Sequence, residues 1–147
     1  MLASDDLAEV KAETTVTAAP AMVFDALTKP SLLARWFADR AEVSLRPGGS
    51  LQIVRDGRSG AGHILDVVIP RRLLIAWDAV QESQIVFPGS ELEFFVSPTD
   101  GGSRVQSVLW KVPAGQADAY AAELTGQLGR LAALRLPGAT RLDDATP

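Results

Sequence analysis

The feature that most constrains the fold is a series of short alternating segments, each closed by a turn signal, that ends in one long helix. Residues 10–18 alternate between apolar and polar side chains, as a half-buried strand does. From residue 41 onward, glycine- and proline-rich turn signals at 47–49, 56–60 and 97–102 divide the chain into further strands. The pattern therefore predicts a first strand followed by successive antiparallel hairpins.

Two neighbouring segments, "GHILDVVI" at 62–69 and "RLLIAWDA" at 72–79, are apolar on both faces and are joined through Pro70 and Arg71. Strands that are apolar on both faces are typical of the interior of a sheet. We therefore expect this hairpin to lie in the middle of the sheet.

Between the first strand and the hairpins, the sequence predicts two short helices. Pro20 begins the first helix, Pro30 ends it, and Ser31 is the expected cap of a second helix that carries Trp36 and Phe37. These large aromatic side chains are expected to close one end of the core. We predict a structural role for Trp36, and no part in a binding site.

The last helix is predicted over residues 115–136. One stripe of this helix is apolar and suits packing on the sheet; its members are Ala117, Tyr120, Ala121, Leu124, Leu128, Leu131 and Ala132. A second, opposite stripe consists of small residues and predicts a homodimer contact; its members are Ala119, Ala122, Gly126, Gly129 and Ala133. Glu123 and Arg130 flank the small stripe and are expected to pair between the two chains. The alternative is a solvated face with a biased composition.

Composition excludes several functional classes. The 14 basic and 18 acidic residues are interspersed, which argues against a nucleic-acid-binding protein, and the absence of cysteine excludes disulfides and thiolate ligands. The acidic start is unlike a signal peptide, and no apolar run approaches the roughly 20 residues of a membrane span. We expect a cytoplasmic protein with one domain at 10–136, an N-terminal extension at 1–9 and a flexible tail at 137–147.

Three stretches of the sequence, "ALTKPSLLARWF", "RPGG" and "GHILDVVIPRRLLIAW", occur in the order and spacing of a known family. With them the chain resembles the proteins similar to the activator of the heat-shock protein 90 ATPase, within the START-like (SRPBCC), birch-pollen-allergen-like helix-grip superfamily. The resemblance implies an α+β fold: a curved antiparallel sheet of about six or seven strands wrapped around a long C-terminal helix, with two short helices after the first strand.

The resemblance implies a binding module that holds a small apolar or amphipathic ligand between the sheet and the last helix. A protein-interaction or cochaperone-like regulatory domain is the first alternative. A cyclase- or hydratase-like enzyme is the second, although the sequence shows no catalytic constellation and no cofactor site. The candidate ligand-binding residues are Asp66, Arg55, Trp77, Phe94, Trp110, Tyr120 and Leu124.

Asp66 is the most informative of these residues, and two orientations of its side chain are open. It shares a face with Ile64 and Val68 in a regular strand, so an inward-facing Asp66 is buried and requires a partner such as Arg55. An exposed carboxylate on the convex face is the equal alternative. His63, the only histidine, is expected at the surface or rim, although Asp66 or Asp78 is a possible orienting partner in a catalytic triad.

The sequence offers no ligand spacing for a transition metal, so no metal site is expected. The segment "QESQIVFPG" at 81–89 places apolar residues in a long connection between two strands. It is expected either to extend a strand or to form a lid over the cavity mouth.

Overall fold

The computed structural model describes residues 6–78 and 87–136 and shows seven strands, two short helices and one long helix. The elements are β1 (Leu7–Val16), α1 (Pro20–Thr28), α2 (Pro30–Leu33), β2 (Arg40–Val43), β3 (Ser50–Arg55), β4 (Arg58–Val68), β5 (Arg72–Trp77), β6 (Glu91–Thr99), β7 (Gly102–Pro113) and α3 (Ala117–Ala133), the last preceded by a 3-10 turn at Ala114–Gln116. This order confirms the predicted α+β helix-grip architecture.

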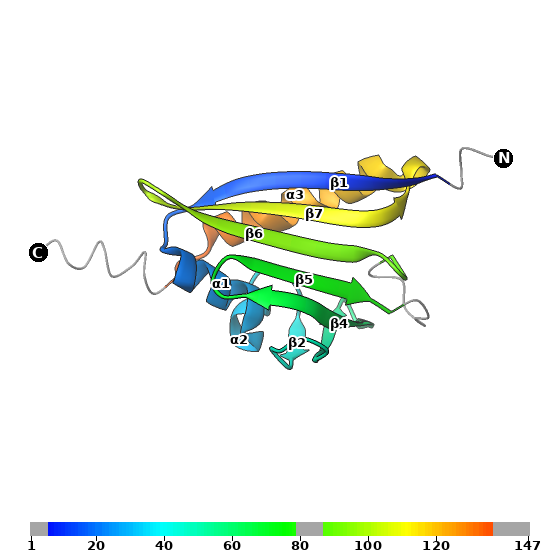
Figure 1. Cartoon of the computed structure of the whole chain (residues 1–147), viewed down its shortest axis with the longest axis horizontal. Coiled ribbons are helices and arrows are strands. Elements are labelled where there is room, and N and C mark those ends of the chain that lie inside the picture. The colour runs from blue at the N-terminus through cyan, green and yellow to red at the C-terminus, as the bar shows by residue number, and fades with distance from the viewer. Residues whose placement is uncertain (1–5, 79–86, 137–147) are drawn as a thin grey trace, which may run out of the picture.

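The seven strands form one curved antiparallel sheet in the order β1-β7-β6-β5-β4-β3-β2 (Figure 1). Strands β2 to β7 follow one another as hairpins, and β1 pairs with β7, so the first strand lies beside the last one. β4 and β5 lie in the interior of the sheet, as their apolar sequences predicted. The predicted inward face of β1 is confirmed, since Val10 and Val16 are buried while Lys11 and Glu13 are exposed.

α3 packs along β1 and β7 and covers the concave face of the sheet (Figure 1). Its predicted leucine stripe is confirmed, because Leu124, Leu128 and Leu131 are almost fully buried. The core therefore lies between this helix and the inward side chains of the sheet, with α1 and α2 closing one end.

Trp36 lies in that core, as predicted, with 3% of its surface exposed. Its indole Nε1 donates a hydrogen bond to the carbonyl of Ala26 at 2.8 Å. In a continuous helix that carbonyl would accept from residue 30, but Pro30 has no N–H to donate. The Trp36 indole therefore supplies the donor that the proline removes, and it joins α1 to the turn after α2.

The second short helix differs from its prediction. α2 begins at Pro30 with Lys29 as its N-cap, and no side chain caps it, so the expected cap at Ser31 is wrong. The helix ends at Leu33, and Trp36 and Phe37 lie in the turn that follows. The two aromatic rings are 5.2 Å apart and remain packed together in the core.

Two glycines permit close backbone approaches, one just before β3 and one on β4. A Cβ on Gly49 would lie 1.9 Å from the carbonyl oxygen of Ser44, so the predicted turn at 47–49 requires glycine there. A Cβ on Gly62 would lie 2.5 Å from the Ala76 carbonyl and 3.0 Å from the Trp77 ring. Gly62 thus lets the Trp77 side chain lie against β4.

Candidate functional site

A small cavity lies between the sheet and α3. Its walls come from the sheet, the turn after α2, the segment before β6, and α3. The lining residues are Phe37, Arg55, Trp77, Phe87, Leu92, Leu109, Tyr120, Glu123, Leu124 and Gln127. The void has a volume of about 30 Å³, which is room for roughly two water molecules.

The floor of the cavity is apolar because three strands point buried side chains at it. Trp77 ends β5, while Leu92 of β6 and Leu109 of β7 lie directly opposite each other in the sheet register. Leu124 closes the space from the helix side with 4% exposure. An apolar floor of this kind favours the hydrophobic part of a ligand.

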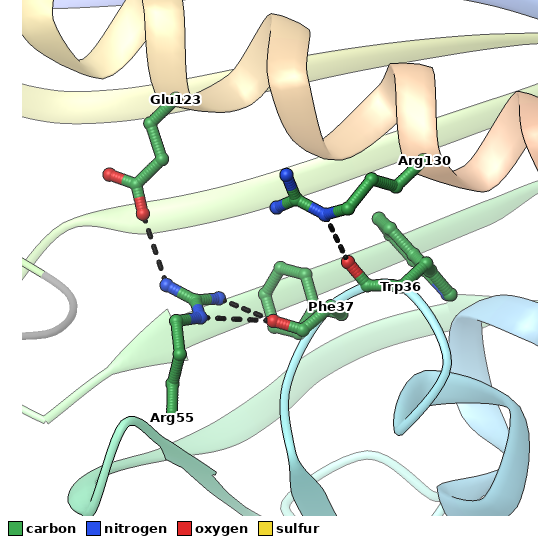
Figure 2. Close-up of polar contacts among 5 residues, drawn as sticks. All are labelled: Trp36, Phe37, Arg55, Glu123 and Arg130. Carbon is green, nitrogen blue, oxygen red and sulfur yellow. Dashed lines mark hydrogen bonds and ion pairs between the residues drawn. The ribbon is translucent and has the colours of Figure 1, made fainter.

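An ion pair between β3 and α3 forms one rim of the cavity (Figure 2). Nη1 of Arg55 lies 3.0 Å from Oε2 of Glu123. Nε and Nη2 of Arg55 both donate to the carbonyl of Phe37, at 3.0 and 2.6 Å, and the guanidinium lies 5.1 Å from the Phe37 ring centre. Burial lowers the pKa of Arg55, and the Glu123 carboxylate opposes that shift. The guanidinium therefore connects three parts of the chain at once.

A second arginine supports the same turn from the helix side. Nε of Arg130 donates to the carbonyl of Trp36 at 3.1 Å, next to the carbonyl that Arg55 contacts (Figure 2). These two carbonyls follow a short helix and have no partner within it. Arg55 and Arg130 thus satisfy consecutive backbone oxygens and tie the turn to both β3 and α3.

Besides Glu123, α3 contributes two polar residues to the cavity wall, Tyr120 and Gln127, and neither side chain has a hydrogen-bond partner among the residues that the structure describes. Tyr120 is partly buried, and its ring meets that of Phe87 edge-on at 6.3 Å. Burial raises the pKa of the Tyr120 phenol, and the nearby Glu123 carboxylate raises it further. Gln127 is 5% exposed. Tyr120 and Gln127 thus belong to the helix wall of the cavity, but the surface of the cavity is almost entirely apolar.

Gln127 was missed by the sequence analysis. It follows Leu124 by three positions and Tyr120 by seven, so helical spacing places it on the cavity side. The signal that identifies it is a polar residue among apolar ones on the inward stripe.

The structure separates the seven predicted ligand-binding residues into three places. Arg55, Trp77, Tyr120 and Leu124 line the cavity. Phe94 lies deeper in the core, where its ring meets that of Trp36 edge-on at 6.2 Å. Asp66 and Trp110 lie on the outer face of the sheet, so the expectation that one cavity gathers all seven is wrong.

Asp66 pairs with Arg72 and not with the expected partner Arg55. The reason is a β-bulge between Ile64 and Asp66, which reverses the facing of the residues that follow. Val67, and not Asp66, packs against the core. Asp66 therefore has the exposed, convex-face position that was the alternative.

The outer face carries a polar chain that crosses four strands. Arg72 of β5 contacts Asp66 of β4 and donates from Nε to Oε2 of Glu93 on β6 at 2.6 Å. Oε1 of Glu93 accepts from the Trp110 indole of β7 at 3.0 Å. The Glu93 side chain is only 7% exposed, and its hydrogen bond raises the pKa of Arg72. This network stabilises the sheet on the face opposite the cavity.

His63 lies at the surface, as expected, with its Nδ1 3.0 Å from Oδ1 of Asp78. It belongs to the outer face of the sheet. The enzyme hypothesis required four polar side chains to converge, but Arg55 and Tyr120 lie at the cavity while Asp66 and His63 lie on the opposite face. Within the described ranges, no group of three or more potential metal ligands occurs. None of the described helices combines the length and hydropathy that a membrane crossing requires.

Two further predictions concern segments around the cavity. Of the segment 81–89, residues 81–86 lie outside the described part of the chain, while Phe87 lines the cavity. The small-residue stripe of α3 is exposed along its whole length, from Ala119 to Ala133. Glu123 and Arg130 both contact their own chain, which weakens the predicted pairing of these two residues between chains.

Comparison with known proteins identifies the family to which this chain belongs. The family model for activator of Hsp90 ATPase homolog 1-like protein matches residues 17–134. No curated protein sequence matches the chain.

Several solved structures share the fold. Protein MLL2253 from Mesorhizobium loti has a TM-score of 0.74 at 20% identity, covering 95% of this chain and 99% of that one. The AHSA1-like protein from Aeromonas hydrophila has a TM-score of 0.70 at 19% identity, covering 94% of each chain. The Aha1 dimer from Colwellia psychrerythraea has a TM-score of 0.68 at 14% identity, covering 85% of this chain and 93% of that one. At these identities the likeness shows the fold.

Proposed function

The chain belongs to the activator of Hsp90 ATPase homolog 1-like family, and from that premise we propose that it is a binding module for a small apolar or amphipathic molecule. The ligand site is the cavity between the sheet and α3. Arg55, Trp77, Tyr120 and Leu124 contact the ligand there. The cytoplasmic location expected from the sequence remains part of this proposal.

The observation that supports this proposal is an apolar space bordered by a few polar groups. Trp77, Leu92 and Leu109 form its floor, while the Arg55–Glu123 ion pair stands at its rim. Small-molecule sites in proteins have this composition, with apolar walls for affinity and a few polar atoms for orientation.

The size of the cavity limits how a ligand binds. About 30 Å³ is far below the roughly 300 Å³ at which drug-sized sites begin. A ligand therefore places only a few atoms in the void, and its remaining part lies at the mouth against Phe87 and Tyr120. Movement of these two side chains is the simplest way to admit a larger molecule, because both are only partly buried.

A protein-interaction or cochaperone-like role is the second candidate, and the same small volume favours it. The outer face of the sheet presents Trp110 at 36% exposure, beside a groove that Phe95 and Val108 line. Exposed aromatic residues next to apolar neighbours are typical of protein contacts. In this alternative the cavity is a small packing defect of the core and binds no ligand.

A homodimer through the small-residue stripe of α3 is part of the proposal. The stripe is exposed, and it lacks the long side chains that keep another backbone at a distance. The relative from Colwellia psychrerythraea is described as a dimer, which agrees with self-association in this family.

Native mass spectrometry tests the small-molecule proposal. The protein is purified without denaturation, and its native mass is compared with its mass after denaturation to reveal a bound molecule. Leu124→Trp fills the cavity from the helix and is expected to abolish the adduct, whereas Trp110→Leu on the outer face leaves it unchanged. Circular dichroism verifies that each variant is folded, and Leu109→Phe serves as a second filling variant. An adduct that survives both filling variants contradicts the site.

A further inference from the structure

Exposed apolar side chains gather at one end of β4. Among the described residues, six large apolar side chains are exposed, and four of these lie at that end of the strand or in the turns beside it. They are Leu45 at 40%, Leu65 at 47%, Val68 at 49% and Ile69 at 67% exposure. Single exposed apolar residues are ordinary, whereas a group of them marks a contact surface.

Backbone hydrogen bonds bring the turn that carries Leu45 to the side of β4. In this turn, which follows β2, Gly48 donates to the carbonyl of Ile64 at 2.7 Å. The N–H of Ile64 donates to the carbonyl of Gly49 at 2.8 Å. Leu65 follows at the β-bulge. The turn and the last residues of β4 therefore form one corner of the sheet.

The turn between β4 and β5, which completes this corner, is fixed by backbone hydrogen bonds on both sides (Figure 1). The N–H of Arg71 donates to the carbonyl of Val68 at 2.6 Å. The carbonyl of Arg71 accepts from Val96 of β6 at 2.8 Å. Ile69 lies within the turn that these bonds close, so its exposure belongs to the folded structure.

The neighbouring turn shows which residues an exposed turn of this sheet needs. β6 and β7 turn back at the same end of the sheet through residues 99–102, which read Thr-Asp-Gly-Gly. Such small and polar residues are usual in a solvated turn. The β4–β5 turn instead reads Val-Ile-Pro-Arg. Its two exposed apolar side chains therefore meet no requirement of the turn itself.

Two arginines flank the apolar side chains of the corner. Arg46 lies in the turn after β2 and Arg71 in the turn after β4, and both are exposed. Neither side chain has a hydrogen bond or an ion pair among the described residues. The nearby carboxylates of Asp66 and Glu93 share Arg72. Even with both carboxylates counted, the corner keeps a positive charge.

The distribution of charge along the chain agrees with this local charge. Residues 29–72 contain eight basic and four acidic side chains, a net charge of +4, although the whole chain has −4. The acidic excess lies in the remainder of the chain. An anionic surface would therefore attract the part of the molecule that contains the corner and repel the rest.

The size of the corner suits a bilayer better than a folded protein partner. A stable protein interface uses roughly 20–30 residues a side, whereas the corner offers four exposed apolar side chains. A bilayer needs no complementary shape. A few apolar side chains enter the boundary between headgroups and acyl chains, and basic residues beside them are attracted to anionic lipids.

We propose that this corner docks on the surface of an anionic phospholipid bilayer. Its apolar side chains enter the boundary of the acyl chains, and Arg46 and Arg71 pair with the headgroups. The inference does not depend on the proposed ligand site, because the residues that line the cavity are all different from those of the corner.

Sedimentation with lipid vesicles tests the proposal. The full chain is mixed with vesicles of phosphatidylcholine alone, and with vesicles of equal parts phosphatidylcholine and phosphatidylserine. We expect binding to the anionic vesicles to be at least tenfold tighter and to weaken as salt is added, because salt screens the arginines. Equal binding to both vesicles, or binding to neither, overturns the proposal.

Two double variants of the corner separate its charge from its apolar surface. Arg46→Gln with Arg71→Gln should weaken binding to the anionic vesicles about 25-fold, since each arginine at such a surface contributes about fivefold. Val68→Ser with Ile69→Ser should weaken it at least fivefold. The Tm should remain that of the wild-type protein, because all four side chains are exposed. Unchanged vesicle binding of either folded double variant contradicts the proposal.

Matched controls lie at the opposite end of the sheet. Arg58 begins β4 and Leu7 begins β1, and both side chains are exposed. Arg58→Gln and Leu7→Ser should each leave binding within about twofold of the wild-type value, because they lie far from the docked corner. If they weaken binding as much as the corner variants do, the attraction is general to the protein surface and the proposal is wrong.

A fluorescent label reports on the contact directly. The chain has no cysteine, so Ile69→Cys and Leu7→Cys each provide one site for a dye that responds to an apolar environment. Anionic vesicles should shift the emission of the dye at position 69 to the blue and leave the dye at position 7 unchanged. Light scattering tests a second copy as the occupant. A wild-type dimer that Val68→Ser with Ile69→Ser converts to a monomer would assign the corner to self-association and overturn the lipid proposal.

Discussion

Arg55 and Glu123, which are 68 positions apart in the chain, meet at 3.0 Å across the cavity rim. Arg55 ends β3 and Glu123 lies in the middle of α3, so this contact joins the sheet to the helix beside the candidate ligand site (Figure 2). The same guanidinium holds the Phe37 carbonyl with two further hydrogen bonds. The two residues of the pair therefore have unequal structural roles.

Removing Arg55 should destabilise the protein more than removing the charge of Glu123. Glu123→Gln loses only a partly exposed ion pair and should lower the free energy of unfolding by about 1 kcal/mol or less. Arg55→Met also leaves the Phe37 carbonyl without its donors and should cost about 1–3 kcal/mol more. Urea denaturation measures both variants. Equal losses would show that the carbonyl contacts contribute nothing to stability.

Trp36 should prove essential to the core. Trp36→Ala removes a buried aromatic side chain and is expected to cost about 3–5 kcal/mol. Trp36→Phe keeps most of the volume but leaves the Ala26 carbonyl without a donor, because Pro30 cannot provide one, and should cost about 1–3 kcal/mol. Chemical denaturation provides both values. A loss below about 1 kcal/mol for Trp36→Ala is incompatible with the structural role.

Tyr120 is the only tyrosine, so the ultraviolet absorbance of its phenolate reports on the cavity directly. Because burial and Glu123 raise its pKa, the folded protein should titrate above the usual value of about 10, and the denatured protein near that value. The stabilisation linked to this shift is present below the unfolded pKa and is lost as the pH rises through the folded pKa.

Two variants separate the causes of this shift. Glu123→Gln should lower the folded pKa of Tyr120, yet leave it raised, since burial is the larger cause. Tyr120→Phe removes the titrating phenol, so the free energy of unfolding should fall less as the pH rises through the phenol pKa. A folded protein whose phenol titrates like a free tyrosine would place Tyr120 in solvent and outside the cavity.

Gly126→Leu tests the proposed dimer. Gly126 is exposed, and a Cβ added there has the Arg130 Nη1 atom, at 3.8 Å, as its nearest described neighbour beyond the local helix backbone. Leucine should therefore stabilise α3 of the isolated domain by about 1 kcal/mol. In a dimer, the same side chain separates the two helices. Light scattering should show a wild-type dimer at high micromolar concentration and a monomer for Gly126→Leu, with Gly126→Ala as a small control. A monomeric wild-type protein ends this proposal.

Local patterns were sufficient to predict the order of strands and helices, whereas the curved sheet around the last helix was an expectation from the family resemblance. The order of strands and helices follows from residue alternation, and the turns follow from signals such as Pro47, Gly48 and Gly49. The structural role of Trp36 was also predictable, because its helical segment had to cover one end of a sheet. These features depend on neighbouring residues, which a single sequence displays.

Features that depend on the pairing of two strands were not predictable in this way. The bulge between Ile64 and Asp66 is a property of β4 and β5 together, and it moves Asp66 to the outer face beside Arg72. Trp110 faces outward for a simpler reason, since it follows the inward Leu109 in the regular register of β6 and β7. Alternation within one strand indicates which residues share a face, but a bulge changes that assignment.

The size and polarity of the cavity could not be predicted from the sequence either. The helical pattern identified Leu124 and Tyr120 as inward residues, but it did not identify Gln127 as a cavity residue. Cavity volume depends on how side chains from several elements pack together, and moving one aromatic ring is enough to fill or open a cavity of this size.

Fluorine NMR of the protein labelled with fluorotryptophan tests the central claim most directly. The three tryptophans lie in three different environments: Trp36 in the core, Trp77 at the floor of the cavity and Trp110 on the outer face. Trp36→Phe, Trp77→Phe and Trp110→Phe assign the signals, and toluene and benzamide are then titrated into the labelled protein. The cavity proposal predicts that the Trp77 signal shifts with saturation while the Trp110 signal stays in place. A saturable shift of Trp110 with Trp77 unchanged would contradict the proposal and move the binding surface to the outer face.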